Sequence, residues 1–307
     1  MKPLIRLTAA LFITLAPVSL ARGTDDKIAL VAAENFYGDV ARQIGGDRVS
    51  VTGILSNPDQ DPHLFEISPA VVREIAAAQI VVYNGADYDP WMARLLAVTP
   101  KPGRVVIVAA ELVNRKAGDN PHLWYDPATM PAVARSLAAA LAAADPAHND
   151  DYTARLKTFL ASLEPLNEKI AAIRGKYAGL PVTATEPVFG DMAAALKLNM
   201  HSERFQLAIM NDTEPSARDV AAVERELKTH KVRVLFYNKQ ASNNLVQHLV
   251  DLAPVSYTHL DVYKRQPLLR RMLGPSFCTR SCTHGKNLSG SSGSSLLSES
   301  DCISSSW

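Results

Sequence analysis

Two short segments of the sequence place a histidine in the same local setting. His63 lies in Asp-Pro-His-Leu-Phe-Glu (61–66), and His122 lies in Asn-Pro-His-Leu-Trp-Tyr-Asp-Pro (120–127). In each segment a proline precedes the histidine and a helix start is predicted to follow, so both rings should be held on stiff loops. A metal ligand needs a neutral imidazole that is fixed in orientation. A single loop histidine is more often a solvated residue, but two in matched settings favour a metal site.

A third candidate ligand is Glu186, in Thr-Glu-Pro-Val-Phe-Gly (185–190). We expect this segment to end a strand and open a helix, where the helix dipole favours an ionised carboxylate. Alone, Glu186 would be interpreted as an ordinary glutamate at a helix start. The remaining histidines of the body lack a partner motif and are interpreted as structural or solvated: His148, His201, His230 and His248.

Strand and helix patterns alternate in the first half of the chain. Strands are predicted over 28–33, 49–55, 80–83 and 105–108, the last two as continuous apolar runs. Helices are predicted over about 36–44 and after Ser68-Pro69, while Asp126 and Pro127 suit the N-cap and first turn of a further helix. Such alternation is typical of βαβ units with a parallel sheet, which bind ligands beyond the carboxyl ends of the strands.

A long helix is predicted over about 150–177, with a kink at Pro165. The second half repeats the alternation, with strands over 182–185 and 232–237 and with helices over 188–196, 216–229 and 243–252. We therefore expect an α/β fold of two lobes, 22–147 and 179–253, joined by one long rigid helix over 148–178.

The first 21 residues have the pattern of a secretory signal peptide. Lys2 and Arg6 precede an apolar run over 7–20, and small residues end at Ala21. An N-terminal membrane anchor is the alternative, but the run is shorter than the roughly 20 residues that span a bilayer. We expect export to the periplasm with cleavage near Ala21. No cysteine follows the run, so a lipid anchor is not expected, and neither is stable membrane insertion.

The character of the sequence changes after Ala253. Residues 267–307 contain 12 serines and all three cysteines, without sustained periodicity. The stretch 255–266 resembles a peptide that recurs where sequencing adapter has been translated. We predict that 254–307 is a non-native, disordered tail and that the C-terminal lobe is truncated. A zinc cluster of Cys278, Cys282 and His284 is the alternative, but its spacing matches no established finger.

Charge is balanced, with 32 basic against 31 acidic residues. No basic excess points to a nucleic-acid partner.

Taken together, the motifs resemble those of the zinc/manganese solute-binding proteins of ABC importers. The resemblance rests on His63, His122 and Glu186 in the segments quoted above and on Phe-Gln-Leu-Ala-Ile-Met-Asn-Asp-Thr-Glu-Pro-Ser (205–216). It covers about residues 24–253 and implies two α/β lobes with the metal between them. His63 and His122 match the N-lobe ligands, and Glu186 matches a third that is His in some members. The family's fourth, acidic ligand lies beyond Ala253 and is missing or unknown here.

The resemblance implies a monomer that captures Zn²⁺ or Mn²⁺ in the periplasm and hands it to the permease of an ABC importer, without being an enzyme. Zinc-specific members often carry a His-rich loop between the first two ligands, but residues 109–120 contain no histidine.

Two other classes of function remain open. The same His/His/Glu set could serve a metal-dependent hydrolase, although the chain has no His-Glu-x-x-His motif. A surface adhesion protein is the other alternative, and no sequence feature supports it directly.

Overall fold

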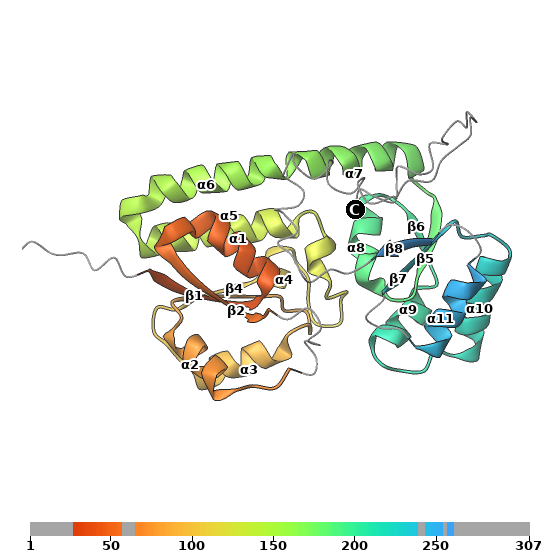
Figure 1. Cartoon of the computed structure of the whole chain (residues 1–307), viewed down its shortest axis with the longest axis horizontal. Coiled ribbons are helices and arrows are strands. Elements are labelled where there is room, and N and C mark those ends of the chain that lie inside the picture. Colours follow the sequence, from red (N-terminus) through yellow and green to blue (C-terminus); the bar gives the residue numbers. More distant parts are fainter. Residues whose placement is uncertain (1–26, 57–64, 239–242, 254–256, 261–307) are drawn as a thin grey trace, which may run out of the picture.

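The computed structural model of the chain describes residues 27–56, 65–238, 243–253 and 257–260. These residues form two lobes, each with a four-stranded parallel sheet, and two consecutive helices that run across both lobes (Figure 1). The predicted α/β fold with two lobes and a long joining helix is confirmed.

The sheet of the N-terminal lobe has the strand order β2-β1-β3-β4. Its strands are β1 (Ile28–Glu34), β2 (Val49–Leu55), β3 (Ile80–Tyr83) and β4 (Val105–Val108). All neighbours are parallel, with Ile28 opposite Val49 and Ile80 opposite Val105. Because the strands run the same way, their carboxyl ends gather at one edge of the sheet, and the loops that follow them start there.

Helices cover both faces of this sheet. Leu30 and Ala32 of β1 face a core shared with α1 (Asn35–Gly45), α5 (Thr129–Ala144) and α6 (Asn149–Ser162). Val31 and Ala33 face a second core shared with α2 (Pro69–Ala77) and α3 (Pro90–Val98). Burial on both faces explains why β1 is a continuous apolar run. Shorter elements lie in the connections between these strands and helices: η1 (Gly46–Arg48), α4 (Ala109–Leu112), η2 (Leu123–Tyr125) and η3 (Pro146–His148).

One predicted helix start is confirmed and one is wrong. The Ser68 hydroxyl accepts a hydrogen bond from Val71 N at 3.3 Å and caps α2, as predicted. The N-cap of α5 is Ala128, two residues after the predicted Asp126. The reason is η2, which uses the residues before Asp126 for its own turn. The Asp126 carboxylate instead accepts from Ala128 N at 2.9 Å and stabilises the turn between η2 and α5.

The joining helix is two helices in line, α6 and α7 (Glu164–Tyr177), with Leu163 between them (Figure 1). Pro165 lies in the first turn of α7, where its missing N–H costs no helical hydrogen bond. The helix predicted to be continuous with a kink at Pro165 is instead divided in two at Leu163. Phe159 and Leu163 belong to the core of the N-terminal lobe, whereas Ile170 belongs to that of the C-terminal lobe. The pair of helices is thus built into both cores.

The C-terminal lobe has a parallel sheet of order β6-β5-β7-β8. Its strands are β5 (Pro181–Ala184), β6 (Asn199–His201), β7 (Val234–Asn238) and β8 (Tyr257–Leu260). Phe236 of β7 packs in the core shared with α7 and α8, and Leu235 packs in the core shared with α9, α10 and α11. The short elements and helices of this lobe are η4 (Pro187–Phe189), α8 (Gly190–Ala195), α9 (Glu203–Met210), α10 (Ala217–Lys228) and α11 (Asn244–Leu252).

Strand β8 lies inside the segment predicted to be a tail without a fold. Its backbone pairs in parallel with β7, with Tyr257 opposite Leu235 and Leu260 opposite Asn238. The sheet therefore gains a fourth strand where a strand was expected to be missing. A physical reason is that the unpaired edge of β7 offers a row of hydrogen-bonding groups to any extended segment that follows. The remainder of the predicted tail, 254–256 and 261–307, lies outside the described residues, as do residues 1–26.

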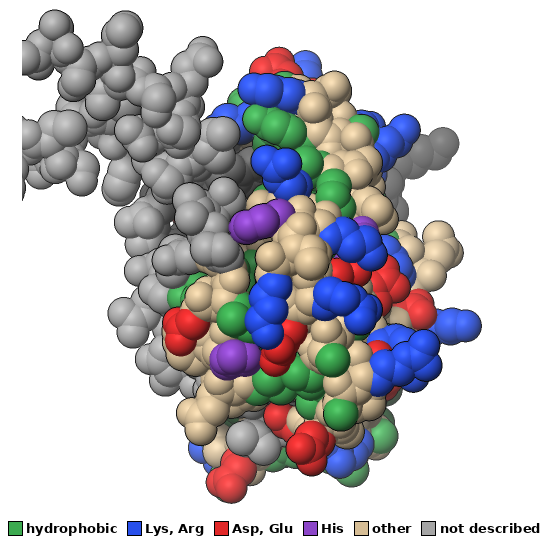
Figure 2. Space-filling view, turned by 90° about the vertical axis from the view of Figure 1, so that its right-hand side faces the viewer, with side chains coloured by type: hydrophobic (Ala, Val, Ile, Leu, Met, Phe, Trp, Pro, Cys, Tyr) green, Lys and Arg blue, Asp and Glu red, His purple; other side chains and the backbone are tan. Residues whose placement is uncertain are grey.

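The end of the molecule formed by the C-terminal lobe carries charges of both signs side by side (Figure 2). On this lobe Lys228 pairs with Glu224 at 2.7 Å and Lys231 with Glu226 at 2.9 Å. Among the helices that the structure describes, none combines the length and the hydropathy needed to cross a membrane.

Candidate metal centre

The structure describes two of the three predicted ligands. His122 lies directly before η2 and Glu186 directly before η4, and both side chains are half-buried. His63 lies outside the described residues, within 57–64. Among the described side chains, no group of three or more His, Cys, Asp and Glu has the arrangement of a metal site. The three-residue ligand set therefore stays a prediction.

His122 is oriented by the asparagine of its own motif. Its Nδ1 lies 2.8 Å from Asn120 Oδ1, which also accepts a hydrogen bond from the His122 backbone N–H at 3.2 Å. An amide oxygen only accepts, so Nδ1 carries a proton, and in the neutral imidazole that a metal needs the lone pair is then on Nε2. Trp124 and Tyr88 meet the ring edge-on, with centroids 5.3 and 6.1 Å away. This is the tautomer and the fixed orientation that a metal-binding imidazole needs.

A buried polar network fixes the backbone of the loop that carries His122. Asn84, which follows β3, donates from Nδ2 to the Pro121 carbonyl at 2.9 Å and accepts from the Tyr37 hydroxyl at 2.7 Å. Asp89 accepts from the backbone N–H groups of Asn84 and Gly85 at 2.7 and 2.8 Å. Burial raises the pKa of Tyr37 well above its ordinary value, so this phenol stays a neutral donor. The backbone next to His122 is thereby fixed to the end of β3.

Two buried carboxyl groups meet at this edge of the sheet. Glu34, the last residue of β1, and Asp89 are neighbours at this edge, and the two residues are only 2% and 1% exposed. Desolvation raises the pKa of Asp89 and outweighs its hydrogen bonds, which lower it. Two carboxyl groups that share a buried site favour a state in which one of them holds a proton. No sequence pattern marks this pair, because Glu34 and Asp89 are 55 positions apart and neither stands in a repeated segment.

Glu186 is held in a corresponding way in the C-terminal lobe. Asn238, the last residue of β7, donates from Nδ2 to Glu186 Oε2 at 2.7 Å. The Asn238 backbone N–H donates to the Thr185 hydroxyl at 3.2 Å. Because β5 and β7 are parallel neighbours, these contacts lie at the carboxyl end of the sheet. The orientation of the Glu186 carboxylate is therefore set by the adjacent strand.

The loops that carry His122 and Glu186 contact each other across the boundary between the lobes. Asn120 Nδ2 donates to the Pro187 carbonyl at 2.8 Å. Nearby, Arg115 pairs with Asp191 of α8 at 2.8 Å, and the Tyr125 ring lies edge-on to Phe189 with centroids 5.6 Å apart. The pKa of Tyr125 is raised to about 12 by burial, so this side chain stays uncharged.

In the ion pair of Arg115 and Asp191, the charged form of the Asp191 carboxyl group is costly to bury. Desolvation raises the pKa of Asp191 even though Arg115 opposes it. Asp191 is only 9% exposed, and Arg115 also lies 3.7 Å from Asp126. Arg115 thus offsets negative charge on both sides of the lobe boundary.

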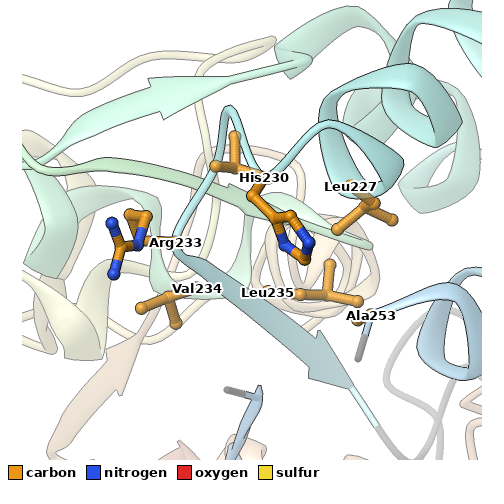
Figure 3. A pocket seen from close by; sticks show the side chains of 7 residues that line it. Leu227, His230, Arg233, Val234, Leu235 and Ala253 are labelled. Carbon is orange, nitrogen blue, oxygen red and sulfur yellow. The ribbon is translucent and has the colours of Figure 1, made fainter. Parts of the chain in front are cut away.

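Two hollows in the described part of the chain lie away from these loops. One, of about 320 Å³, surrounds the start of β7, where His230 lies near Leu227 and Leu235 while Arg233 lies apart (Figure 3). The other, of about 550 Å³, includes Ile28 at the start of β1 and His148. Both hollows lie at the amino ends of strands, opposite the edges that carry His122 and Glu186. Neither hollow is therefore a candidate for the metal centre.

Residues 30–266 match the protein family described as the periplasmic zinc-uptake complex component A. A metal-binding protein of Treponema pallidum is 25% identical over 73% of this chain and 76% of its own length. The manganese ABC transporter substrate-binding lipoprotein of Streptococcus anginosus is 26% identical over 55% of this chain, which spans about 60% of that relative's length.

Solved structures share the fold. A structure of ZnuA covers 81% of this chain and 95% of its own, with a TM-score of 0.63 and 22% identity. The periplasmic zinc-binding protein TroA of Treponema pallidum covers 74% and 84%, with a TM-score of 0.62 and 18% identity. A manganese-bound periplasmic metal-binding protein of Candidatus Liberibacter asiaticus covers 76% and 88%, with a TM-score of 0.63 and 18% identity.

Proposed function

Because this chain belongs to the family of periplasmic zinc-uptake components, we propose that it captures a divalent transition metal and delivers it to the permease and ATPase of an ABC importer. The observation that carries the proposal is the pairing of two oriented candidate ligands on touching loops. His122 is oriented by Asn120, and Asn120 also contacts the residue after Glu186. The metal is cargo, so the protein needs to bind it tightly and later release it.

The proposed ligands are His63, His122 and Glu186. Imidazole nitrogen and carboxylate oxygen suit both zinc and manganese, and the general affinity order of divalent metals favours zinc at a site that does not select by geometry. The manganese named for the streptococcal relative and the zinc named for TroA agree with this range. We therefore propose Zn²⁺ or Mn²⁺ as the cargo.

We further propose that the chain acts as a monomer in the periplasm after its signal peptide is removed. Solute-binding proteins are not enzymes, and the comparisons give no support to a hydrolase or to an adhesion protein.

Direct titration tests the proposal. Metal-free protein without residues 1–21 is titrated with Zn²⁺ and with Mn²⁺ in a calorimeter, with Mg²⁺ as a control cation. We expect saturable binding of one Zn²⁺ or Mn²⁺ per chain and no such binding of Mg²⁺, which prefers an all-oxygen octahedral shell. A chain that binds neither transition metal would refute the proposed function.

A further inference from the structure

Asn120 has two different contacts, one with a candidate metal ligand in its own lobe and one with the opposite lobe. We propose that Asn120 is a positioning residue that couples the orientation of His122 to the position of the Glu186 loop. The proposal deepens the proposed function and rests on it for the role of His122 as a ligand.

The first argument is the hydrogen-bonding capacity of the amide. Its oxygen accepts from the backbone N–H and from Nδ1 of His122, and its nitrogen donates to the Pro187 carbonyl at 2.8 Å. These contacts settle which end of the amide is oxygen, because the Pro187 carbonyl can only accept. A carboxylate could accept from His122 but could not donate to Pro187. Only an amide at position 120 makes both sets of contacts.

The second argument comes from Gly190, the first residue of α8. A Cβ built on Gly190 would lie 3.0 Å from Asn120 Nδ2, closer than ordinary van der Waals contact. The backbone of Gly190 has φ −58°, which any residue adopts, so the turn itself does not require glycine. The absence of a side chain here therefore makes room for the Asn120 amide against the C-terminal lobe.

The third argument is that other contacts hold the same boundary. The Arg115–Asp191 ion pair and the Tyr125–Phe189 ring contact join the two lobes without touching His122. Variants at position 120 should therefore fold with the lobes still in contact. We expect these variants to change the coupling between the orientation of the His122 ring and the position of the Glu186 loop.

The tautomer of His122 in metal-free protein gives a test that does not depend on metal binding. Nitrogen-15 NMR of the histidine rings is recorded for the wild type, Asn120→Ala and Asn120→Asp, with His122→Gln used to assign the signal. We expect the Nδ1–H tautomer of His122 in the wild type, its loss in Asn120→Ala, and its retention in Asn120→Asp, which keeps the acceptor. An unchanged tautomer in Asn120→Ala would overturn the proposal.

A double-mutant cycle tests the coupling to the opposite lobe. Zn²⁺ affinity is measured for Gly190→Ala, Asn120→Ala and the combined variant. We expect Asn120→Ala to weaken binding about 10–100-fold, the usual range for residues that orient a ligand. Gly190→Ala should weaken binding when Asn120 is present and have little further effect when it is absent. An equal effect of Gly190→Ala in both backgrounds would overturn the coupling. Wild type that binds no metal would refute the proposed function instead, while the NMR result would still decide the role of Asn120.

Discussion

Asn238 donates a hydrogen bond to Glu186 across two neighbouring parallel strands, with 2.7 Å between Nδ2 and Oε2. The two residues are 52 positions apart in the chain, yet each ends or follows a strand of the same sheet. The carboxylate that the sequence singled out is thus oriented by a residue that no motif marked.

Replacing Asn238 should weaken metal binding without removing a proposed ligand. We expect Asn238→Ala to lower Zn²⁺ affinity about 10–100-fold, because the Glu186 carboxylate loses its orienting donor. Competition titration against a chromogenic chelator measures the change. Asn199→Ala is the matched control, since Asn199 contacts His201 at the far end of the sheet. Equal affinities of the two variants would contradict a role for Asn238 in positioning Glu186.

Replacing His122 should have a larger effect. We expect His122→Ala to lower Zn²⁺ and Mn²⁺ affinity by more than the roughly 100-fold upper range for orienting residues, because a ligand itself is lost. Binding to the wild type should also weaken as the pH falls, since protons compete for the imidazole nitrogen. Calorimetric titration at several pH values measures both effects. His148→Ala serves as control, because the His148 ring is paired with Asp145 at 2.7 Å, away from the site. The assignment fails if both alanine variants bind like the wild type.

The stability of the C-terminal lobe should depend on pH through Glu226. Burial raises the pKa of Glu226, but hydrogen bonds from His201, Lys231 and Ser202 outweigh burial and lower it. A lowered folded-state pKa stabilises the fold above the unfolded pKa of about 4.3, and this contribution is lost as the pH falls through the folded value.

Thermal melts between about pH 3 and pH 7 test this dependence. We expect Glu226→Gln to melt below the wild type near neutral pH and the difference to shrink as the pH falls below about 4. Glu168→Gln, on the exposed face of α7, is the control for loss of a surface carboxylate. A difference between Glu226→Gln and wild type that stays constant over this pH range would contradict the prediction.

The last prediction concerns the end of the chain. Residues 267–307 have no periodic apolar pattern, so deleting them should leave the melting temperature unchanged. On the prediction that the segment after Ala253 is foreign and that the resemblance implies an acidic ligand there, replacing these residues with the ending of a family member should raise the melting temperature and strengthen Zn²⁺ binding. Differential scanning calorimetry with and without Zn²⁺ compares the three proteins. Collapse of the fold on deleting 267–307 would show that this segment is a genuine structural element.

Much of the fold was predictable because the sequence patterns that indicate strands and helix caps are local. The strands at 49–55, 80–83 and 105–108 are short segments, the last two of them continuous apolar runs, and their observed bounds equal the predicted ones. Ser68 caps a helix as predicted, and Ser216 caps the helix predicted to begin at it, since a cap needs only a hydroxyl three residues before a backbone N–H. Strand β6 was missed because three residues carry too little pattern to predict an edge strand.

The sequence by itself determined the α/β alternation, the joining helix with an irregularity near Pro165, and the motifs that mark His122 and Glu186. Only the tertiary structure decided what orients them: Asn120 against Pro187, Asn238 against Glu186, and the buried pair of Glu34 and Asp89. These partners are 52 to 67 positions apart. The physical reason is that parallel strands bring distant residues to one edge of a sheet, and hydrogen bonds of about 3 Å depend on strand register and lobe packing, which local sequence patterns do not encode.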